Sequence, residues 1–310
     1  MPDRDLTIWP KPVADRDFVH HFCDAARILS DVVSDVSHEF AAAIAGRDQE
    51  VDLFGAAVAI AGLGGHTPDR HRIASQLDLI AEAVREEAGE TLDCSRQVNA
   101  INHQLFVEGG FHGNRDDYSA PENSYLDRVM DRRTGIPITL SLVYMEVAQR
   151  VGLRCDGIGF PGHFLVRCGE PEAAIYVDAF EQGTRLDSEE LLARLRSLPL
   201  GSATPESFLA AVTRRQMLQR MLNNLHVAFR SARDMERWHA TVDLLLRIEP
   251  WNAALTGERG MLNYRLGNAA AALDDLGRYV EATGRPQVSA GALRLLDELR
   301  LHQRGREETG

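Results

Sequence analysis

The 310-residue chain contains a single lysine, Lys11, so arginine supplies nearly all of its positive charge. Its 46 acidic residues outnumber its 34 basic residues, which gives a formal net charge of −12. Proteins that bind nucleic acid or anionic membranes usually carry the opposite balance. We therefore expect neither nucleic acid nor a membrane among the partners, and we interpret arginine pairs such as Arg132–Arg133 as solvated helix surface.

Cysteine is also scarce, and its spacing excludes a disulfide framework. There are four thiols and no CxxC pair: Cys23, Cys94, Cys155 and Cys168. Such spacing in a chain of this length is typical of reduced thiols in the cytosol. The longest apolar stretch, Leu53 to Gly65, is too short and too glycine-rich to span a bilayer, and the opening MPDRDLTIWPKP has no apolar signal core. We expect a soluble, cytoplasmic protein.

The eleven histidines do not form a metal motif, since no HExxH occurs. His20 and His21 are adjacent in a predicted helix, so their side chains diverge instead of converging on one ion. His66 and His71 flank a proline turn and are interpreted as surface residues. We predict no metal site.

One glycine pattern resembles a dinucleotide fingerprint and is rejected. GIGFPG, from Gly157 to Gly162, is a literal GxGxxG. A dinucleotide fingerprint must open a helix, whose N-terminus holds the pyrophosphate. Here Pro161 precedes the alternating sequence HFLVR, which is typical of a strand. We predict no cofactor.

Residues 1–105 are predicted to form a helical N-terminal part that packs on the following core. Apolar residues recur three and four positions apart in Asp17–Val33 and again in His71–Gly89. Residues 106–200 are predicted to form that core. In it, Pro137 suits the first position of a helix that is apolar nearly all round and that Gly152 ends.

After this buried helix the period changes to that of strands. GIGF, HFLVR and AIYVDAF predict a small antiparallel sheet, so the fold class is α+β. His163 begins the second of these segments and Asp178 lies in the third. Pairing around the intervening GEPEA turn would place His163 opposite Asp178 or Ala179, and the register stays open by one residue.

Residues 213–303 are predicted to be helical repeats. A spacing of 34 residues relates Trp238 to Ala272 and His226 to Gly260, which gives two helix–turn–helix units. These units resemble tetratricopeptide repeats, in which Gly260 and Ala272 would occupy small-residue positions. His226 and Trp238 depart from that pattern. Two repeats bury too little surface to be stable alone, so we expect the module to dock on the preceding domain.

The core supplies most of a nucleophilic triad. A cysteine at a helix N-terminus is activated by the helix dipole, a histidine accepts its proton, and a carboxylate orients the imidazole. His163 and Asp178 suit the last two roles. Without further information, a structural hydrogen bond between them is the simpler interpretation.

The stretch from Asn123 to Leu153, NSYLDRVMDRRTGIPITLSLVYMEVAQRVGL, followed by GFPGHFLVR, resembles the SirB-type transglutaminase-like family. The resemblance covers roughly residues 15–300. It implies a papain-like core with C-terminal tetratricopeptide-like repeats, and it matches His163 and Asp178 to the histidine and aspartate of the triad. The nucleophilic cysteine position falls on Pro137, which has no nucleophilic atom.

The nearest hydroxyls to the missing nucleophile are those of Thr139 and Ser141. A hydroxyl gains little ionised fraction from a helix dipole, so either would depend on His163 and an oxyanion hole. For Thr139 we favour the interpretation that it caps its own helix. Cys168 faces away from His163, and Cys155 is interpreted as a packing residue.

The leading hypothesis is a non-catalytic transglutaminase-like protein that binds a protein or peptide. The repeat module and the cleft near His163 would form the binding surfaces. The alternative is an amidase or acyl-transfer enzyme with Thr139 or Ser141 as nucleophile and the His163–Asp178 pair as base. A third possibility makes His163 a sensor that changes partner affinity between about pH 6 and 7.5.

Overall fold

The structure is a computed structural model that describes residues 35–89, 93–170, 173–199 and 201–307, without the side chains of residues 305–307. The predicted helix Asp17–Val33 and the histidines and cysteine within it lie outside the described residues. The chain divides into two compact units, and residues 36–228 form the first of them. Residues 229–307 belong to the second. Among the described residues, every helix is too short or too polar to cross a membrane.

The first unit is α+β, as predicted. Its helices are α2 (Leu53–Ala61), α3 (Arg70–Ala88), α4 (Cys94–Asn102), α5 (Leu126–Arg132), α6 (Pro137–Arg150), α7 (Ser188–Arg196) and the first part of α8 (Arg214–Ala232). Its strands are β1 (His112–Gly113), β2 (Thr134–Gly135), β3 (Cys155–Ile158), β4 (Leu165–Cys168), β5 (Ile175–Asp178) and β6 (Thr184–Leu186).

Helix α6 forms the centre of this unit. It begins at Pro137, as predicted, because a proline at the first helical position removes an N–H that would have no partner there. Eleven of its fourteen residues are buried, and only Gln149, in its last turn, is exposed. The helix ends at Arg150, and Gly152 then adopts a left-handed conformation with φ of 77°, which confirms the predicted glycine stop.

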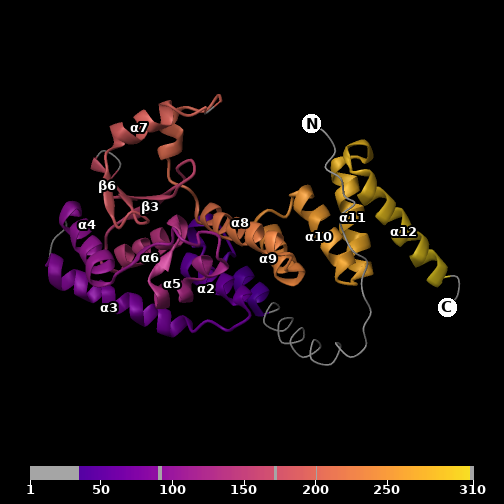
Figure 1. The fold of residues 1–310 in the computed structure, drawn as a ribbon, viewed down its shortest axis with the longest axis horizontal. Helices are drawn as coiled ribbons and strands as arrows, with labels where there is room; N and C mark the ends of the chain where they lie inside the picture. The colour runs from indigo at the N-terminus through magenta and orange to yellow at the C-terminus, as the bar shows by residue number, and fades with distance from the viewer. Residues whose placement is uncertain (1–34, 90–92, 171–172, 200, 308–310) are drawn as a thin grey trace. The chain divides into compact units, whose positions relative to one another are not determined.

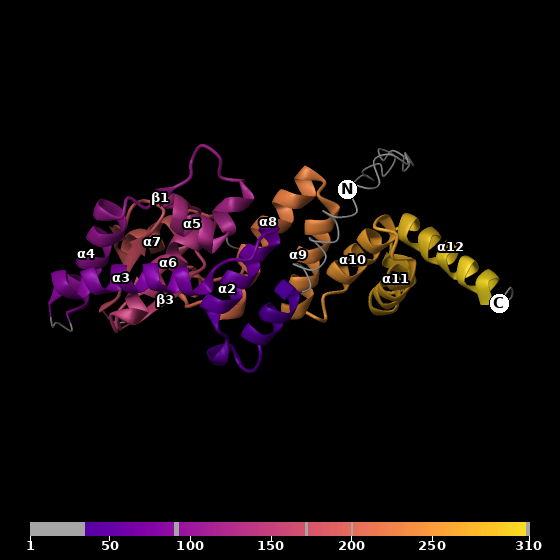
Figure 2. The same ribbon diagram turned by 90° about the horizontal axis from the view of Figure 1, so that it is seen from below.

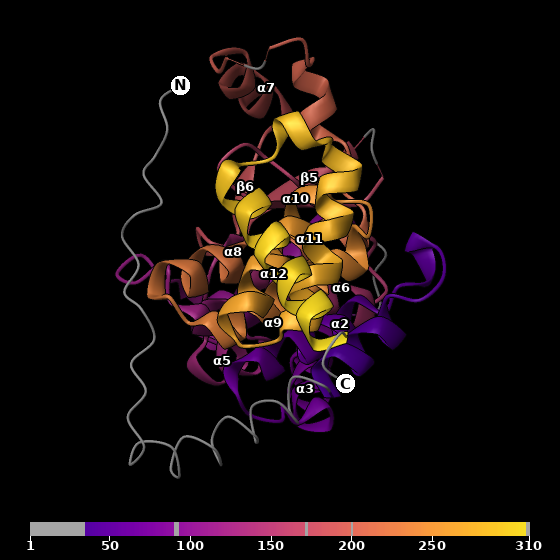
Figure 3. The same ribbon diagram turned by 90° about the vertical axis from the view of Figure 1, so that its right-hand side faces the viewer.

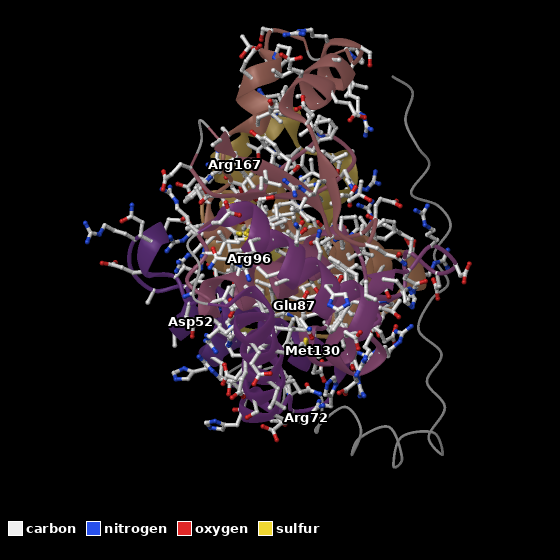
Figure 4. The ribbon with its side chains drawn as sticks, turned by 90° about the vertical axis from the view of Figure 1, so that its left-hand side faces the viewer. Asp52, Arg72, Glu87, Arg96, Met130 and Arg167 are labelled. Atoms are coloured by element: carbon white, nitrogen blue, oxygen red, sulfur yellow. The ribbon has the colours of Figure 1, made fainter. Side chains whose placement is uncertain are left out.

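The N-terminal helices cover one side of α6, and α3 runs alongside it (Figure 2). Each of these helices begins at an aspartate whose side chain accepts a backbone N–H of the first turn: Asp52 for α2, Asp69 for α3 and Asp93 for α4. Figure 4 looks onto this side, where Arg72 and Glu87 mark the two ends of α3 and Arg96 lies on α4.

The four-stranded sheet is an antiparallel meander in the order β3-β4-β5-β6. The central strands are the buried ones: every residue of β4 except Arg167 and every residue of β5 except Ile175 is buried, whereas Thr184 and Arg185 of the edge strand β6 are exposed. Leu165 and Tyr176 pack against Leu191 and Leu195 of α7, which lies over the sheet in Figure 1. The opposite face contacts α6. The register pairs Val166 with Val177.

A second, two-stranded sheet places a long loop beside the start of α6. β1 and β2 are parallel, and Asn114 N donates to Gly135 O at 2.8 Å. The loop that follows β1 ends in a 3₁₀ helix, Pro121–Ser124, directly before α5. Residues distant in sequence, from the loop and from α6, are thereby brought into contact.

The second unit is helical: α9 (Met235–Ile248), α10 (Ala253–Arg265), α11 (Ala269–Thr283) and α12 (Ala290–Glu307). Figure 3 looks onto α12, with α11 and α10 behind it. Helices α10 and α11 approach closely because Gly260 has no side chain: a Cβ there would lie 2.9 Å from Leu276 Cγ. Ala272 is fully buried in the same contact region.

A polar network crosses these helices. Arg259 donates to both oxygens of Asp275, at 2.9 and 2.8 Å, and to Asp243 at 2.8 Å, while Asn263 donates to Asp275 at 3.0 Å. It joins α9, α10 and α11. His239 of α9 lies beside this network, and its Nε2 is buried without a hydrogen-bond partner in the described part of the chain. Burial lowers the pKa of His239, and Asp243 opposes this effect.

We predict that acid destabilises the repeat unit through His239. Because its pKa in the folded chain is below the ordinary 6.5, the unfolded state binds its proton first as the pH falls. The contribution of neutral His239 to the free energy of unfolding is therefore complete above about pH 6.5 and is lost progressively as the pH falls below that value. Urea unfolding from pH 7.5 to 5 checks this. His239→Gln should reduce the dependence of the free energy of unfolding on pH, whereas the same substitution at exposed His302 should leave that dependence as in the wild type.

Candidate functional site

The start of α6 is the position at which a transglutaminase-like nucleophile would lie. Pro137 stands at the first helical position and is buried, after Ile136 in extended conformation. Gly135 is required before it, because a Cβ there would come within 2.8 Å of Thr139 Oγ1. The sequence GIPIT thus builds a tight entry into the helix, and it contains no thiol and a single hydroxyl, that of the buried Thr139.

Thr139 is fully buried, and its hydroxyl holds the helix entry together. Oγ1 accepts a hydrogen bond from Ile136 N at 3.1 Å and lies 2.7 Å from Asn123 O, to which it donates. Ile136 O, at 3.1 Å, is the alternative acceptor. The hydroxyl therefore caps the helix and ties it to the preceding loop, which is the structural role favoured from the sequence.

Ser141 is also fully buried, but its hydroxyl has no hydrogen-bond partner among the described residues. Among the described residues, neither the Ser141 nor the Thr139 hydroxyl forms a hydrogen bond with His163. The assignment of Thr139 as a catalytic residue stays a prediction.

His163 lies in the turn between β3 and β4. The prediction that it begins a strand is wrong, because β4 starts at Leu165. His163 N donates to Phe160 O at 3.0 Å, and Gly162 supplies the left-handed conformation, φ 71°, that the turn requires. The predicted register is also wrong: pairing of Val166 with Val177 sets Leu165 opposite Asp178. The turn geometry, not the strand register, brings His163 to Asp178.

The side chains of His163 and Asp178 form a short hydrogen bond. Nε2 lies 2.6 Å from Oδ2, and the two side chains are 25% and 8% exposed. The other carboxylate oxygen, Oδ1, accepts the backbone N–H groups of Phe180 and Glu181, each at 3.1 Å. Both oxygens of the buried carboxylate are thereby satisfied, so Asp178 is fixed in place.

This arrangement determines which ring nitrogen is available for chemistry. An ionised carboxylate can only accept, so it holds the imidazole proton on Nε2 and leaves the lone pair of Nδ1 free to accept a proton. A positioned thiol or hydroxyl next to Nδ1 would complete a nucleophilic triad. In the pair as it stands, Asp178 orients the imidazole ring and Nδ1 of His163 can accept a proton.

Aromatic and arginine side chains surround His163, and no local sequence pattern predicted them. The Phe180 ring meets His163 edge-on with centroids 6.0 Å apart, and Tyr118 meets Phe180 at 6.1 Å. Arg115 lies over Phe180. From α8, Arg220 donates to His163 O at 2.8 Å, and burial lowers the pKa of its guanidinium. Only the fold reveals this cluster, because its members lie far apart in sequence.

A second histidine–aspartate pair lies elsewhere in the same unit. His66 Nε2 is 2.5 Å from Asp127 Oδ2, with side chains 26% and 4% exposed. His66, predicted to be a surface residue, is partly exposed and is held by this hydrogen bond to Asp127. Asp127 lies in the first turn of α5, sixty-one residues away. Among the described residues, no three His, Cys, Asp or Glu side chains converge to hold a metal ion.

A buried helix, the small antiparallel sheet that follows it and a histidine–aspartate pair at one end of that sheet define a transglutaminase-like, papain-like core. Residues 71–223 match the transglutaminase-like superfamily, and residues 225–297 match the tetratricopeptide repeat. The chain belongs to the SirB-type transglutaminase-like family with C-terminal repeats, as the relatives below show.

A UPF0162 protein of Xylella fastidiosa strain Temecula1 is 37% identical over 204 residues, which is 64% of this chain and 73% of that protein. Protein SirB1 of Salmonella typhimurium is 23% identical over 216 residues, 69% of this chain and 80% of that protein. F-box only protein 21 of Mus musculus is 37% identical over 139 residues, covering 42% and 21% respectively. No solved structure matches the chain.

We predict that Asp178→Asn reverses the tautomer of His163. An asparagine amide can donate to Nε2, which would move the imidazole proton to Nδ1. Long-range ¹H–¹⁵N spectra of histidine-labelled chain should show Nε2–H in the wild type and Nδ1–H in the variant. Asp127→Asn, at the second pair, should change only His66. An unchanged His163 spectrum in Asp178→Asn would contradict the orienting role.

The two buried hydroxyls of α6 should differ in their effect on stability. Thr139→Val leaves Ile136 N and Asn123 O without their partner, so we expect a loss of about 1–3 kcal/mol in the free energy of unfolding. Ser141→Ala removes a hydroxyl that forms no bond, so we expect a change within roughly 1 kcal/mol. Urea unfolding of both variants measures the difference, and equal losses would contradict the capping role of Thr139.

Proposed function

We propose that this chain is a transglutaminase-like pseudoenzyme that binds a protein or peptide partner and regulates through that binding. Its binding surfaces are the region around His163 and the tetratricopeptide repeats. The observation that carries the proposal is the first turn of α6, in which Pro137 stands at the nucleophile position and the Thr139 hydroxyl is buried and hydrogen-bonded.

The region beside His163 offers surface for a peptide. Tyr118 is 48% exposed and, through Phe180, joins an edge-to-face aromatic series that ends at His163. Tyr118 also lines a cavity of about 130 Å³, together with the rest of the Tyr118–Pro121 loop and α8 residues including Val227, which is 63% exposed. Exposed apolar side chains that line one cavity suit an extended segment with apolar side chains.

The repeat unit offers a second surface. A cavity of about 420 Å³ is lined by residues of α9, α10 and α11 and by the connection between α9 and α10. Trp251 lies in that connection and is 76% exposed, while Arg247 and Arg259 line the cavity wall. Tryptophan and arginine are the side chains most enriched among those that dominate binding energy at protein interfaces. Repeat proteins commonly bind partners in such concave surfaces.

The proposed setting is the cytoplasm. Three cysteines within the described residues, Cys94, Cys155 and Cys168, are free thiols, as is usual in a reducing compartment. The relatives and family matches give a family and not an activity, so the proposal of a binding function rests on the site itself.

A second candidate function draws on the intact His163–Asp178 pair. An enzyme of the amidase or acyl-transfer class would need a hydroxyl to reach Nδ1, which requires the helix entry to rearrange and release Thr139 from Asn123 O. One experiment separates the two candidates.

We expect hydroxyl- and thiol-directed acylating probes to leave the α6 hydroxyls unmodified. Full-length chain is treated with each probe, digested and analysed by mass spectrometry, beside His163→Ala as the matched variant. Scattered or absent labelling that does not depend on His163 supports the pseudoenzyme. A single adduct on Thr139 or Ser141 that disappears in His163→Ala would establish the enzyme instead.

We further expect selected peptides to bind the repeat surface. A random peptide display library is panned against the full chain, and the recovered peptides are tested by isothermal titration. Trp251→Ala should weaken binding about tenfold or more, the usual loss at a central aromatic contact, whereas Leu79→Ala, at an exposed position on α3, should have no effect. A library from which no peptide binds saturably would contradict the proposal.

A further inference from the structure

Two thiols face each other across the β3–β4 hairpin. Cys155 and Cys168 are directly opposite in the antiparallel register, and their sulfur atoms are 2.8 Å apart. Both are free. Directly opposite residues on antiparallel strands have Cα separations within the range that a disulfide spans. The backbone therefore already holds the two sulfurs where a bond between them requires only a small movement.

The cavity beside the hairpin gives access to one of these thiols. Cys168 is fully buried, but Cys155 is partly exposed and lines a cavity of about 920 Å³. Asp52, labelled in Figure 4, lines the same cavity, as do Glu146 and Arg154. A small polar oxidant can thus reach Cys155, and through it Cys168.

The surroundings of Cys155 keep its thiol protonated at neutral pH. The Cys168 thiol, followed by burial, raises the pKa of Cys155. The Tyr144 phenol lies against the same sulfurs, and its pKa is raised mainly by burial and then by both thiols. Cys94, at the start of α4, interacts with the pair electrostatically, and its pKa is raised chiefly by burial. A reaction through the Cys155 thiolate is therefore slow at pH 7 and faster in alkali.

We propose that Cys155 and Cys168 form a reversible dithiol–disulfide couple that a hydroperoxide oxidises by way of the cavity. This site is independent of the proposed binding function.

The chemistry balances without any other reactant. The Cys155 thiolate attacks one peroxide oxygen, the O–O bond breaks, and hydroxide leaves to become water. The resulting sulfenic acid is attacked by the Cys168 sulfur. The S–O bond then breaks, the S–S bond forms, and a second water leaves with the thiol proton. The two sulfurs lose two electrons in total, and hydrogen peroxide is reduced to two waters.

The position of the couple gives it a structural consequence. Cys155 and Cys168 form the terminal pair of the hairpin, and His163 lies in the turn at its other end. A covalent bond at the open end restricts how far β3 and β4 can separate, and so restricts the turn that positions the imidazole beside Asp178. The oxidation state of the thiols is thereby coupled to the mobility of His163.

Digestion with trypsin places each of the four cysteines in a separate peptide, because arginines lie between them. A disulfide can therefore be identified from the pair of peptides that it links. Cys155 lies in the peptide Cys155–Arg167, Cys168 in Cys168–Arg185, and Cys94 in residues 86–96. Reduced full-length chain is treated with graded hydrogen peroxide, unfolded in urea with N-ethylmaleimide, digested without reductant and analysed by mass spectrometry. We expect the two hairpin peptides to appear disulfide-linked, with equal loss of alkylation at both cysteines and full reversal by dithiothreitol.

Matched variants distinguish the proposal from general oxidation. Cys94→Ala should keep the linked pair, whereas Cys168→Ala should leave Cys155 as a sulfenic acid that dimedone traps. Wild-type oxidation should accelerate as the pH is raised from 7 to 9. The proposal is overturned if Cys155 proceeds to sulfinic acid while Cys168 stays alkylatable in the wild type, or if the dominant linked peptide contains Cys94. Because these readouts need no binding partner, their failure leaves the proposed function untouched.

Discussion

Helix α6 is apolar on nearly every side, and the rest of the first unit is arranged to keep water from it. The N-terminal helices cover one side, the sheet covers another, and the loop after β1 closes over its start. At that start, burial leaves no solvent to satisfy backbone groups. The Thr139 hydroxyl therefore performs that task, and the same burial removes it from chemistry. The stability of the helix entry and the burial of the Thr139 hydroxyl thus have one physical origin.

The hydrogen bond between His163 and Asp178 has a structural explanation that does not require catalysis. A buried carboxylate is costly unless its oxygens are hydrogen-bonded. Asp178 meets this requirement with two amides of its own turn and with His163, while Arg220 holds the His163 carbonyl. The His66–Asp127 pair has a similar short Nε2–Oδ2 hydrogen bond in a different place, but its Oδ1 has no hydrogen-bond partner among the described residues. Because such a hydrogen bond occurs twice in one unit, its presence at His163 is not by itself evidence of catalysis.

Local signals in the sequence were sufficient for α3, α6, the helical repeats and the class of fold, but α4 and α7 were not predicted. Pro137 and Gly152 mark the bounds of α6 because their backbone preferences act within one or two residues. The strand-like segments GIGF, HFLVR and AIYVDAF overlap β3, β4 and β5, whereas β1, β2 and β6 were not predicted. The register between β4 and β5 was not predictable, because it depends on how the turns around His163 and after Cys168 close. The contacts of Tyr118, Phe180 and Arg220 were missed for a related reason: they come from three separate segments and carry no shared period.

Tryptophan is distributed unevenly between the two units, so tryptophan fluorescence does not report on both of them equally. Apart from Trp9, the chain has Trp238, which donates to Glu258 and lies under Arg230, and the exposed Trp251. Both belong to the repeat unit, and residues 36–228 contain none. The change in fluorescence of these two tryptophans on denaturation will therefore report on the unfolding of the repeats. Trp238 is held by a hydrogen bond, whereas Trp251 is already exposed to solvent in the folded chain. The transglutaminase-like unit could melt earlier or later without altering that signal, so tyrosine absorbance or circular dichroism must report on it.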